Sequence, residues 1–242
     1  MSDSPSGRLA RDKWVRRLYL PAYAVGEVAH LARLHRTTIG NWYYGRPRRS
    51  GGRGHKVLGE RERGASLSYL DLVEVAFVAT LRNMGVRLRR IRIARDYLAR
   101  VFNTDYPFAR LKLKTDGARI LYDLKEEEGP WVDRLLGEAS AYGQVIWKEP
   151  ILDRIMEFDY DLDRQLAIRW FPRGREAPVV VDPQIQFGAP ILRETGVPTW
   201  VVKERYEVGE TVDEIKADFG IELQAIMYAL AFEGIQPVVA TA

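Results

Sequence analysis

The stretch VGEVAHLARLHRTTIGNWYY, residues 25–44, contains two short amphipathic patterns separated by a break near Arg33. In the second pattern Ile39, Trp42 and Tyr43 stand at i, i+3 and i+4, so a helix would place them on one apolar stripe. In the first pattern, the residues expected to face inward are Val25, Val28, Ala29 and either Leu31 or Ala32. Turns of this kind often use glycine, which adopts the left-handed conformation at little cost, but here the turn position holds Arg33. The spacing predicts a helix-turn-helix.

The opposite face of the second predicted helix is small and polar, and its side chains can donate hydrogen bonds. Asn and Arg make bidentate contacts with base edges, and glycine lets a backbone approach a duplex closely. We therefore interpret this face as a candidate DNA-contacting surface for the major groove. The candidate residues are Arg36, Thr37, Gly40, Asn41 and Tyr44. The alternative is a helical hairpin whose polar face is only solvated.

Residues 45–66, which we call the basic loop, hold seven basic residues, two acidic residues, six glycines and one proline. That composition resists regular structure and predicts a loop, a wing or an arm. Its basic side chains would bind phosphates or enter a minor groove. The candidates are Arg46, Arg48, Arg49, Arg53 and Lys56. A disordered charged loop is the alternative.

Charge divides the chain into two contrasting parts. Residues 1–120 contain 25 Lys and Arg against 10 Asp and Glu, a net charge of +15. The rest contains 12 against 23, a net charge of −11. This split indicates one part suited to a polyanion and another suited to a different partner, although uneven solvated surfaces would also produce it.

The C-terminal part repeats the helix-turn-helix pattern with the opposite charge. Thr211 and Glu214 form a capping box, and Gly220 supplies the turn. After Tyr206 the single basic residue is Lys216, against seven acidic residues, so phosphates would repel this segment. We interpret it as a protein-binding or dimerising module. Its candidate partner-binding residues are Trp200, Met227, Tyr228 and Phe232, some of which must serve its own core.

The remaining patterns complete the expected fold. Ser68 and Asp71 form a capping box that opens a helix over 69–84. Further predictions are a helix over 86–102, a β-hairpin at Asp116-Gly117, a short acidic helix after 125, strands or a helix up to 176, and strands with tight turns from 178. The fold class is mainly α with small β elements. The expected parts are a winged helix-turn-helix domain at 1–124, a mixed middle region at 125–177 and a second helix-turn-helix domain at 178–242.

Several classes of function are disfavoured. The sequence has no cysteine, which excludes a disulfide framework and thiolate chemistry, and His30, His35 and His55 lack metal-ligand spacing. The run DYDLDR at 159–164 begins like a calcium loop but has Arg164 where glycine is needed. No catalytic constellation is recognisable, so we expect no enzyme, no cofactor and no metal. The absence of a signal region or long apolar run predicts a soluble cytoplasmic protein.

Two resemblances add to this picture. YAVGEVAHLARLHRTTIGNW at 23–42, followed by LSYLDLVEVAFVATLRNMGVRLRRIRIA at 67–94, resembles the winged helix-turn-helix of MerR-type regulators. VVVDPQIQFGAPILRETGVPTW at 179–200, then GETVDEIKADFGIELQAIMYAL at 209–230, is similar to the small helix-turn-helix domain of unknown function found in VapB-like antitoxins. Together, in this order, they resemble a mycobacterial-type VapB antitoxin encoded beside a PIN-like VapC ribonuclease toxin.

That resemblance implies a type II antitoxin that neutralises a PIN-like toxin and binds operator DNA to repress its own operon. We also expect the chain to form a homodimer. Two positions depart from the family pattern, Arg33 in place of a turn glycine and Lys216 where a small residue usually packs. Antitoxins often place an arginine in the acidic site of such toxins, and the acidic C-terminal part offers few. The alternative is a stand-alone MerR-like regulator whose acidic half senses a ligand or dimerises.

Overall fold

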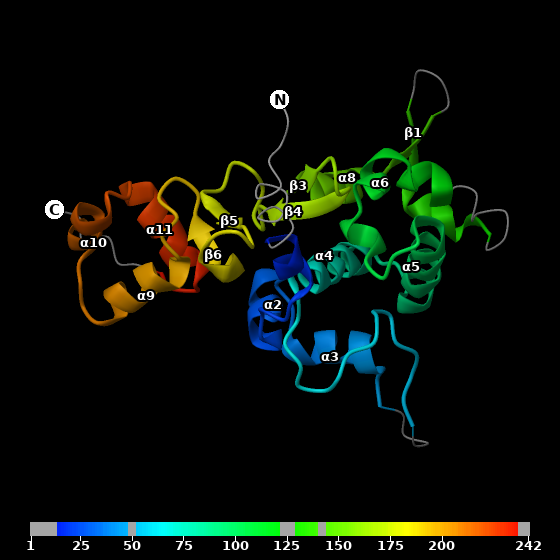
Figure 1. Ribbon diagram of the computed structural model, residues 1–242, viewed down its shortest axis with the longest axis horizontal. Helices are drawn as coiled ribbons and strands as arrows, with labels where there is room; N and C mark the ends of the chain where they lie inside the picture. The colour runs from blue at the N-terminus through cyan, green and yellow to red at the C-terminus, as the bar shows by residue number, and fades with distance from the viewer. Residues whose placement is uncertain (1–13, 48–51, 122–128, 140–143, 237–242) are drawn as a thin grey trace, which may run out of the picture. The chain divides into compact units, whose positions relative to one another are not determined.

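A computed structural model describes residues 14–47, 52–121, 129–139 and 144–236. The chain divides into two compact units, Met1–Ile168 and Arg169–Ala242. Helices predominate in the described residues, which also hold a two-stranded and a four-stranded sheet (Figure 1). The predicted fold class, mainly α with small β elements, is confirmed.

The first two helices after residue 20 are α2 (Val25–Leu31) and α3 (Arg36–Tyr44), joined by a short turn. Arg33 in that turn has a φ of 53°, which is the left-handed conformation expected there. A residue with a side chain is strained in this region by about 1 kcal/mol. The turn therefore forms with arginine in place of the usual glycine at that cost. The three residues of the predicted apolar stripe are all buried: Ile39, Trp42 and Tyr43.

Helix α4 (Tyr69–Asn83) is the central helix of the first unit, and its side chains are buried all the way to Leu81. It begins as predicted, because the Ser68 side chain accepts a hydrogen bond from the backbone N–H of Asp71 while the Asp71 carboxylate accepts one from the backbone N–H of Ser68. It ends before Gly85, whose φ is 79°. A helix that is buried on all sides needs partners for each polar side chain that it carries.

Helix α5 (Leu88–Phe102) and the short helix η1 (Pro107–Ala109) pack beside α4. Phe77 of α4 stacks on Phe108 with ring centroids 5.5 Å apart and on Phe158 with centroids 5.7 Å apart. Because Phe158 begins strand β3 (Phe158–Asp161), the core of the first unit includes residues beyond 124. The functional division of the chain at 124 and 178 stays a prediction.

The predicted hairpin at Asp116-Gly117 is wrong. Helix α6 (Leu111–Thr115) precedes this point, Asp116 is a turn, and residues 117–121 are helical again. The glycine meets a packing need instead of a turn, because a Cβ at Gly117 would lie 2.8 Å from Cζ2 of Trp147. The Trp147 indole N–H also donates to the carbonyl of Leu113 at 3.0 Å, which fixes the ring against this helix.

The middle of the chain combines short helices and strands, and the run KEEE at 125–128, with which the expected acidic helix begins, lies outside the described residues. Residues 122–128 lie outside the described residues, and the next segment is a 3-10 turn followed by a strand. Strand β1 pairs with β2 in antiparallel register, with Leu136 opposite Trp147. The acidic run at 159–164 spans the end of β3 and the turn that follows it, in which Asp161 Oδ1 accepts from the Arg164 backbone N–H at 2.8 Å. The elements are η2 (Pro130–Arg134), β1 (Leu136–Ala139), β2 (Gln144–Trp147), α8 (Glu149–Met156), β3 and β4 (Leu166–Trp170).

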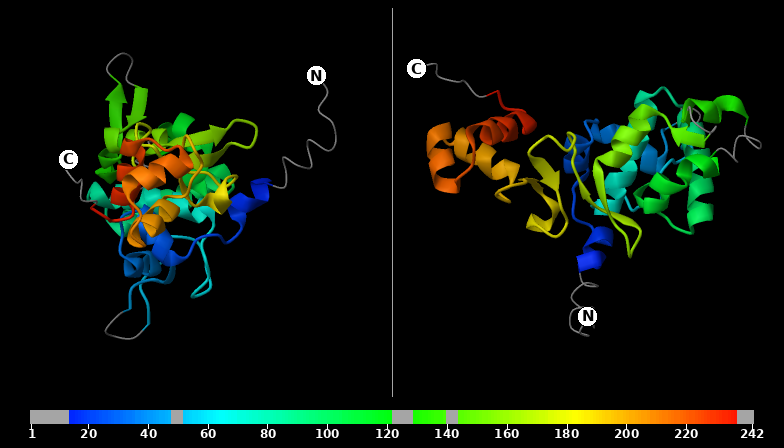
Figure 2. Two further views of the ribbon diagram at one scale, coloured as in Figure 1. Left: turned by 90° about the vertical axis from the view of Figure 1, so that its left-hand side faces the viewer. Right: turned by 90° about the horizontal axis from the view of Figure 1, so that it is seen from above.

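The second unit combines short strands with three helices (Figure 2). Within this unit β5 pairs with β6, and Trp170 at the end of β4 pairs with Val181. The predicted capping box of Thr211 and Glu214 is present, and Gly220 closes the turn with a left-handed φ of 63°. The elements are β5 (Val179–Val181), η3 (Gln186–Gly188), β6 (Pro190–Leu192), α9 (Thr199–Glu207), α10 (Val212–Phe219) and α11 (Leu223–Phe232).

Candidate nucleic-acid interface

The first turn of α3 carries the most exposed of the predicted DNA-contacting residues on that helix, Arg36 and Thr37. His35 is the N-cap, and its Nδ1 accepts a hydrogen bond from the backbone N–H of Thr37 at 3.3 Å. Sequence reasoning missed this role because histidine is not among the usual capping residues. The other candidates on the same face are half-buried: Gly40, Asn41 and Tyr44.

The basic loop starts at a position that only glycine can occupy. Gly45 has a φ of 72°, and a Cβ there would lie 1.9 Å from the carbonyl oxygen of Gly54. The two sides of the loop pair at this point, since the Gly54 N–H donates to the carbonyl of Arg46 at 2.8 Å and Pro47 forms an antiparallel bridge with Arg53. Residues 45–47 and 52–54 are therefore paired in a short antiparallel ribbon, and the basic loop projects from the first unit below α3 (Figure 1).

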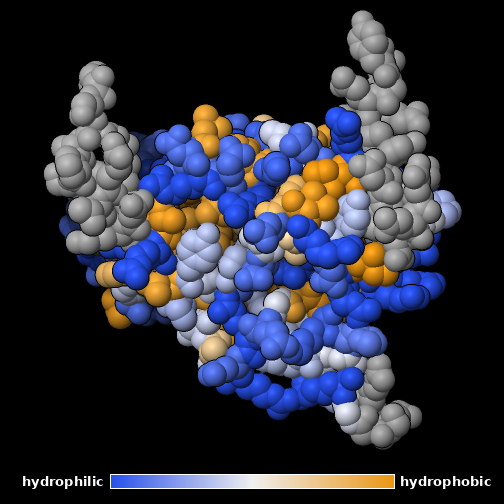
Figure 3. Space-filling model, turned by 45° about the vertical axis from the view of Figure 1, so that its right-hand side comes forward, coloured by the Kyte–Doolittle hydropathy of each residue, from blue (hydrophilic) through white to orange (hydrophobic). Residues whose placement is uncertain are grey.

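The basic side chains of this ribbon differ in their surroundings. Arg46 is exposed, whereas the guanidinium of Arg53 donates to two carbonyl oxygens at the C-terminal end of α3, at 3.2 and 3.4 Å. Lys56 forms an ion pair with Glu60 at 2.6 Å. The described part of the basic loop has a largely hydrophilic surface (Figure 3). Two further candidates lie outside the described residues: Arg48 and Arg49.

The end of α3 holds the returning half of the basic loop. The Tyr44 hydroxyl donates to the carbonyl of Glu62 at 2.8 Å, and the Arg63 guanidinium lies 5.7 Å from the Tyr44 ring centroid. The carbonyl of Trp42 accepts from the N–H groups of residues 57 and 58, at 2.8 and 3.1 Å. Helix and loop thus form one connected structure, in which much of Tyr44 is already engaged within the protein.

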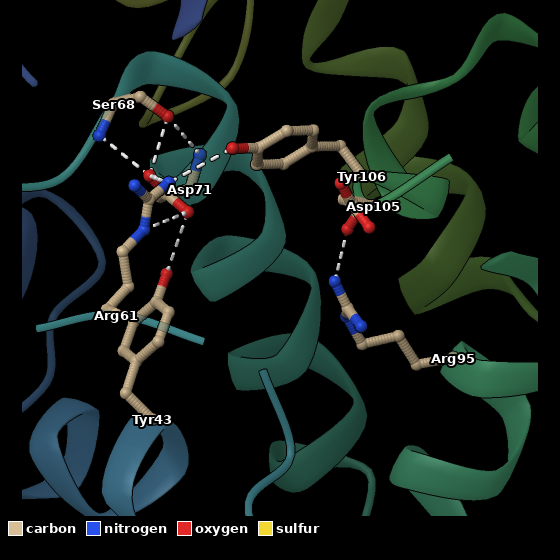
Figure 4. A network of polar contacts seen from close by, with 7 residues as sticks. All are labelled: Tyr43, Arg61, Ser68, Asp71, Arg95, Asp105 and Tyr106. Carbon is tan, nitrogen blue, oxygen red and sulfur yellow. Dashed lines mark hydrogen bonds and ion pairs between the residues drawn. The ribbon is translucent and has the colours of Figure 1, made fainter. Parts of the chain in front are cut away.

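A buried carboxylate joins both elements to α4. The Asp71 carboxylate accepts from the Tyr43 hydroxyl at 3.3 Å, from Nε of Arg61 at 3.2 Å and from a second guanidinium nitrogen of Arg61. It also accepts from the Ser68 backbone N–H at 2.8 Å and hydroxyl at 2.6 Å. We call these four residues the Asp71 cluster (Figure 4). Burial, and then the charges of Asp71 and Glu74, raise the pKa of Tyr43, so its hydroxyl stays protonated and can donate.

A second buried carboxylate lies one turn further along α4. Glu74 pairs with Arg95 of α5 at 2.8 Å and accepts from the backbone N–H of Phe108 at 2.7 Å. Burial raises the pKa of Glu74 to about 7, although the charge of Arg95 opposes this shift. Arg95 also donates to the carbonyl of Asp105. A cavity of about 290 Å³ is lined by Tyr43, Arg61, Asp71, Glu74, Arg95 and Tyr106.

Sequence reasoning read Asp71 only as a helix cap and gave Glu74 no role. A signal for both was present, because two acids at i and i+3 interrupt an otherwise apolar helix. Acids inside such a helix are buried only when they are paired. Their partners come from residues 43, 61, 95 and 108, which the sequence alone does not connect.

The candidate partner-binding residues of the second unit lie in different surroundings. Trp200 is 47 % exposed and Met227 and Tyr228 are half-buried, whereas Phe232 is 7 % exposed. The guanidinium of Arg173 lies 5.0 Å from the Phe232 ring centroid. Phe232 therefore belongs to the core of its own unit.

Tyr228 borders a hollow of about 630 Å³ in the second unit, which we call the α11 hollow. One wall is the first half of α11 with Ile221, and the other includes Leu192 at the end of β6 and Arg193, which follows it. The wall residues are mixed in charge, with Arg173, Arg193, Glu176, Glu194 and Glu222. A volume of this size lies in the range of small-ligand sites and also accepts a few side chains of a partner protein.

Known proteins resemble this chain in sequence and in fold. A family model described as "Protein of unknown function (DUF433)" matches residues 179–232. A Mycobacterium tuberculosis protein named "Putative antitoxin VapB45" is 25% identical over 228 residues, which cover 88% of this chain and 94% of that protein. The crystal structure of Rv2018 from the same organism has a TM-score of 0.75 and 24% identity, covering 88% of this chain and 99% of that one.

The expected similarity to VapB-like antitoxins is confirmed by the relative and by the match over the predicted C-terminal domain. The Rv2018 structure shows that the fold is shared. In the part of the chain that the structure describes, no group of three or more His, Cys, Asp or Glu side chains is placed to hold a metal ion. No helix among the described residues has the length and apolar character needed to cross a membrane.

Proposed function

We propose that this chain is the antitoxin of a type II toxin-antitoxin system, with DNA binding in the first unit and toxin binding in the second. The observation that carries the proposal is the relative named as an antitoxin, whose similarity extends over 88% of this chain and 94% of its own length. The physical features of the two units supply separate support for the two binding activities.

For DNA, the support is that the basic loop directly follows α3, so a helix and a basic ribbon lie next to each other in the chain. An α-helix fits the major groove, and Arg36 and Asn41 have side chains that make bidentate base contacts. The ribbon would follow the backbone or enter the adjacent minor groove, with Arg46, Arg48 and Arg49 neutralising phosphates. A homodimer would place two such surfaces on a palindromic operator.

For the toxin, the support is the acidic character of the segment after Tyr206 and the exposed Trp200. Tryptophan is a frequent anchor of protein interfaces. Acidic residues disfavour DNA there, so the second unit would bind a protein, which we take to be a PIN-like ribonuclease. Repression of its own operon and toxin neutralisation would then reside in separate parts of one chain.

The test is co-expression of the full chain with the product of its neighbouring gene. We expect the two to co-purify, the complex to lose ribonuclease activity, and the antitoxin to shift the DNA upstream of its own gene. Absence of a stable complex, together with retained DNA binding, would contradict the antitoxin function.

DNA binding without a stable complex would favour a stand-alone transcriptional regulator. The α11 hollow is the observation that favours this alternative, because its volume suits a small ligand. A regulator of this kind would bind its operator without a partner protein, and the operator affinity would respond to a metabolite.

A further inference from the structure

The described helices α4 and α10 each begin with a capping box made by a hydroxyl residue and an acid, and the two boxes differ in what their carboxylates contact. In the box at the start of α10, Glu214 is exposed and accepts hydrogen bonds from the backbone N–H and hydroxyl of Thr211, both at 2.7 Å. In the box at the start of α4, Asp71 is 4 % exposed and also accepts hydrogen bonds from Tyr43 and Arg61. Capping alone therefore does not account for the surroundings of Asp71.

Tyr43 and Arg61 belong to the two segments that carry the candidate DNA-contacting residues. Tyr43 lies in the last turn of α3, and Arg61 lies in the returning half of the basic loop. Their side chains converge on Asp71 at the first turn of α4, and Figure 4 shows the two pointing to the same carboxylate. Tyr106 adds a further contact, since its hydroxyl lies 3.0 Å from the Arg61 guanidinium.

The charges make this junction stronger than a surface contact. The Arg61 and Asp71 side chains are 21 % and 6 % exposed, so water screens their attraction only in part. Burial would lower the pKa of Arg61, but its hydrogen bonds to Asp71 and the charge of Asp71 raise that pKa, so the guanidinium stays charged. Removing one member of such a pair leaves the other charge without its partner in a partly dry site.

We propose that Asp71 is a positioning residue that fixes α3 and the basic loop to α4 as one rigid DNA-binding surface. This inference rests on the proposed DNA-binding function of the first unit. α4 is the most buried helix of that unit, so an anchor on it orients both elements against the same fixed frame. The remaining links, from Trp42 and Tyr44 to the loop, connect α3 and the loop to each other.

The first test measures local opening of the full chain without DNA, by hydrogen exchange. The reporters are the N–H groups of Val57 and Leu58, which donate to the Trp42 carbonyl. In Asp71→Asn and in Arg61→Gln we expect these to exchange about tenfold faster, while amides of α11 keep their rates. Tyr43→Phe removes one hydroxyl and should give a smaller increase. Glu214→Gln is the matched control, because it changes a capping-box acid in the other unit.

The double variant Arg61→Gln/Asp71→Asn separates positioning from simple loss of stability. Neutralising both members removes the unpaired charge, so the thermal midpoint should recover toward wild type while exchange at residues 57 and 58 stays fast. Unchanged exchange at these residues in both single variants would overturn the proposal, whatever the DNA results. Exchange that rises equally across the whole first unit would also overturn it, because that pattern indicates global unfolding.

The second test measures DNA affinity of the same full-length variants. We expect Asp71→Asn to weaken operator binding about tenfold and to weaken random-sequence binding less than threefold, because non-specific affinity depends mainly on the number of phosphates neutralised. Equal losses on both DNAs would contradict a positioning role. If the wild type binds no DNA, the proposed function fails, and the exchange experiment still decides whether Asp71 joins these elements.

Discussion

The Tyr44 hydroxyl donates a hydrogen bond to the backbone carbonyl of Glu62 at 2.8 Å, which links the last turn of α3 to the returning half of the basic loop. The preceding residue, Tyr43, points into the unit and reaches Asp71. Of these two adjacent tyrosines, Tyr44 thus contacts the loop and Tyr43 contacts α4. The sequence predicts that Tyr44 contacts base edges or phosphates, and any such contact must form around a side chain that is half-buried and already hydrogen-bonded.

Replacement of Arg36 and Asn41 by alanine should weaken operator binding by at least tenfold. The reason is that each good bidentate base contact contributes roughly 1–3 kcal/mol of discrimination. Fluorescence anisotropy with operator and random-sequence duplexes measures both affinities. Lys203→Ala, which removes one positive charge from α9, is the control. Operator affinity that stays within about threefold of wild type would show that α3 does not read the sequence.

Alanine at Arg46, Arg48 and Arg49 should reduce the dependence of log K on log salt without changing sequence preference. Each lost phosphate contact lowers the slope by about 0.9, so three lost contacts lower it by roughly 2–3. Substitution is preferable to deletion of the loop, because deletion would also remove Arg61. The charge-matched control replaces three residues of the second unit, Arg193, Lys203 and Lys216. An unaltered slope would mean that the loop does not contact phosphates.

Glu74 should make the first unit less stable as the pH rises. Its pKa in the folded protein is about 7, above the ordinary 4.5, so the folded state binds the proton more tightly than the unfolded state. The stability is fully present below pH 4.5 and is lost as the pH rises through 7, by roughly 3 kcal/mol. Denaturant unfolding of wild type and Glu74→Gln at pH 5 to 8 measures this.

The Glu74→Gln variant carries a constant loss from the unpaired Arg95, but its stability should not follow this pH trend. Glu214→Gln is again the control. Hydrogen bonds from Thr211 lower the pKa of Glu214, so its contribution is lost only as the pH falls below the ordinary carboxyl range. A wild-type protein whose stability rises between pH 5 and 7 relative to Glu74→Gln would contradict the assignment.

Gly45→Ala should disrupt the basic loop, and Gly52→Ala should not. Both positions have positive φ, 72° and 74°, so alanine is strained at each by about 1 kcal/mol. At Gly45 the new Cβ would also lie 1.9 Å from the Gly54 carbonyl, whereas at Gly52 it would meet nothing within 4 Å. Hydrogen exchange at residues 54–58 compares the two variants. Similar exchange in both would contradict the pairing of residues 45–47 with residues 52–54.

Trp200→Ala and Phe232→Ala should separate partner binding from folding. Trp200 is 47 % exposed, so its truncation should reduce capture of the toxin with little effect on the thermal midpoint. Phe232 is 7 % exposed, and loss of a buried phenylalanine costs about 3–5 kcal/mol of stability. Pull-down and thermal unfolding of both variants test the two roles. Full toxin capture by Trp200→Ala would exclude this side chain from the interface.

Local sequence determined where α4 and α10 begin and where the turns around them form. The capping boxes at Ser68 and Thr211 and the left-handed turn at Gly220 lie where the sequence predicted them, because each depends on residues at most four apart. The same holds for the apolar stripe of α3. Even the left-handed turn at Arg33 followed from its position between two amphipathic patterns, against the preference of its side chain.

Tertiary structure decided the features that depend on distant residues. The sequence predicts a turn at Gly117 because it does not reveal that Trp147 packs against this residue. The Trp147 ring occupies the space that a Cβ at Gly117 would need. The Asp71 cluster gathers residues up to 28 positions apart in the chain, and the pKa of Glu74 depends on burial by neighbours that arrive only on folding. Spacing encodes contacts within one helical turn, whereas the partners of a buried charge are set by how the whole chain packs around it.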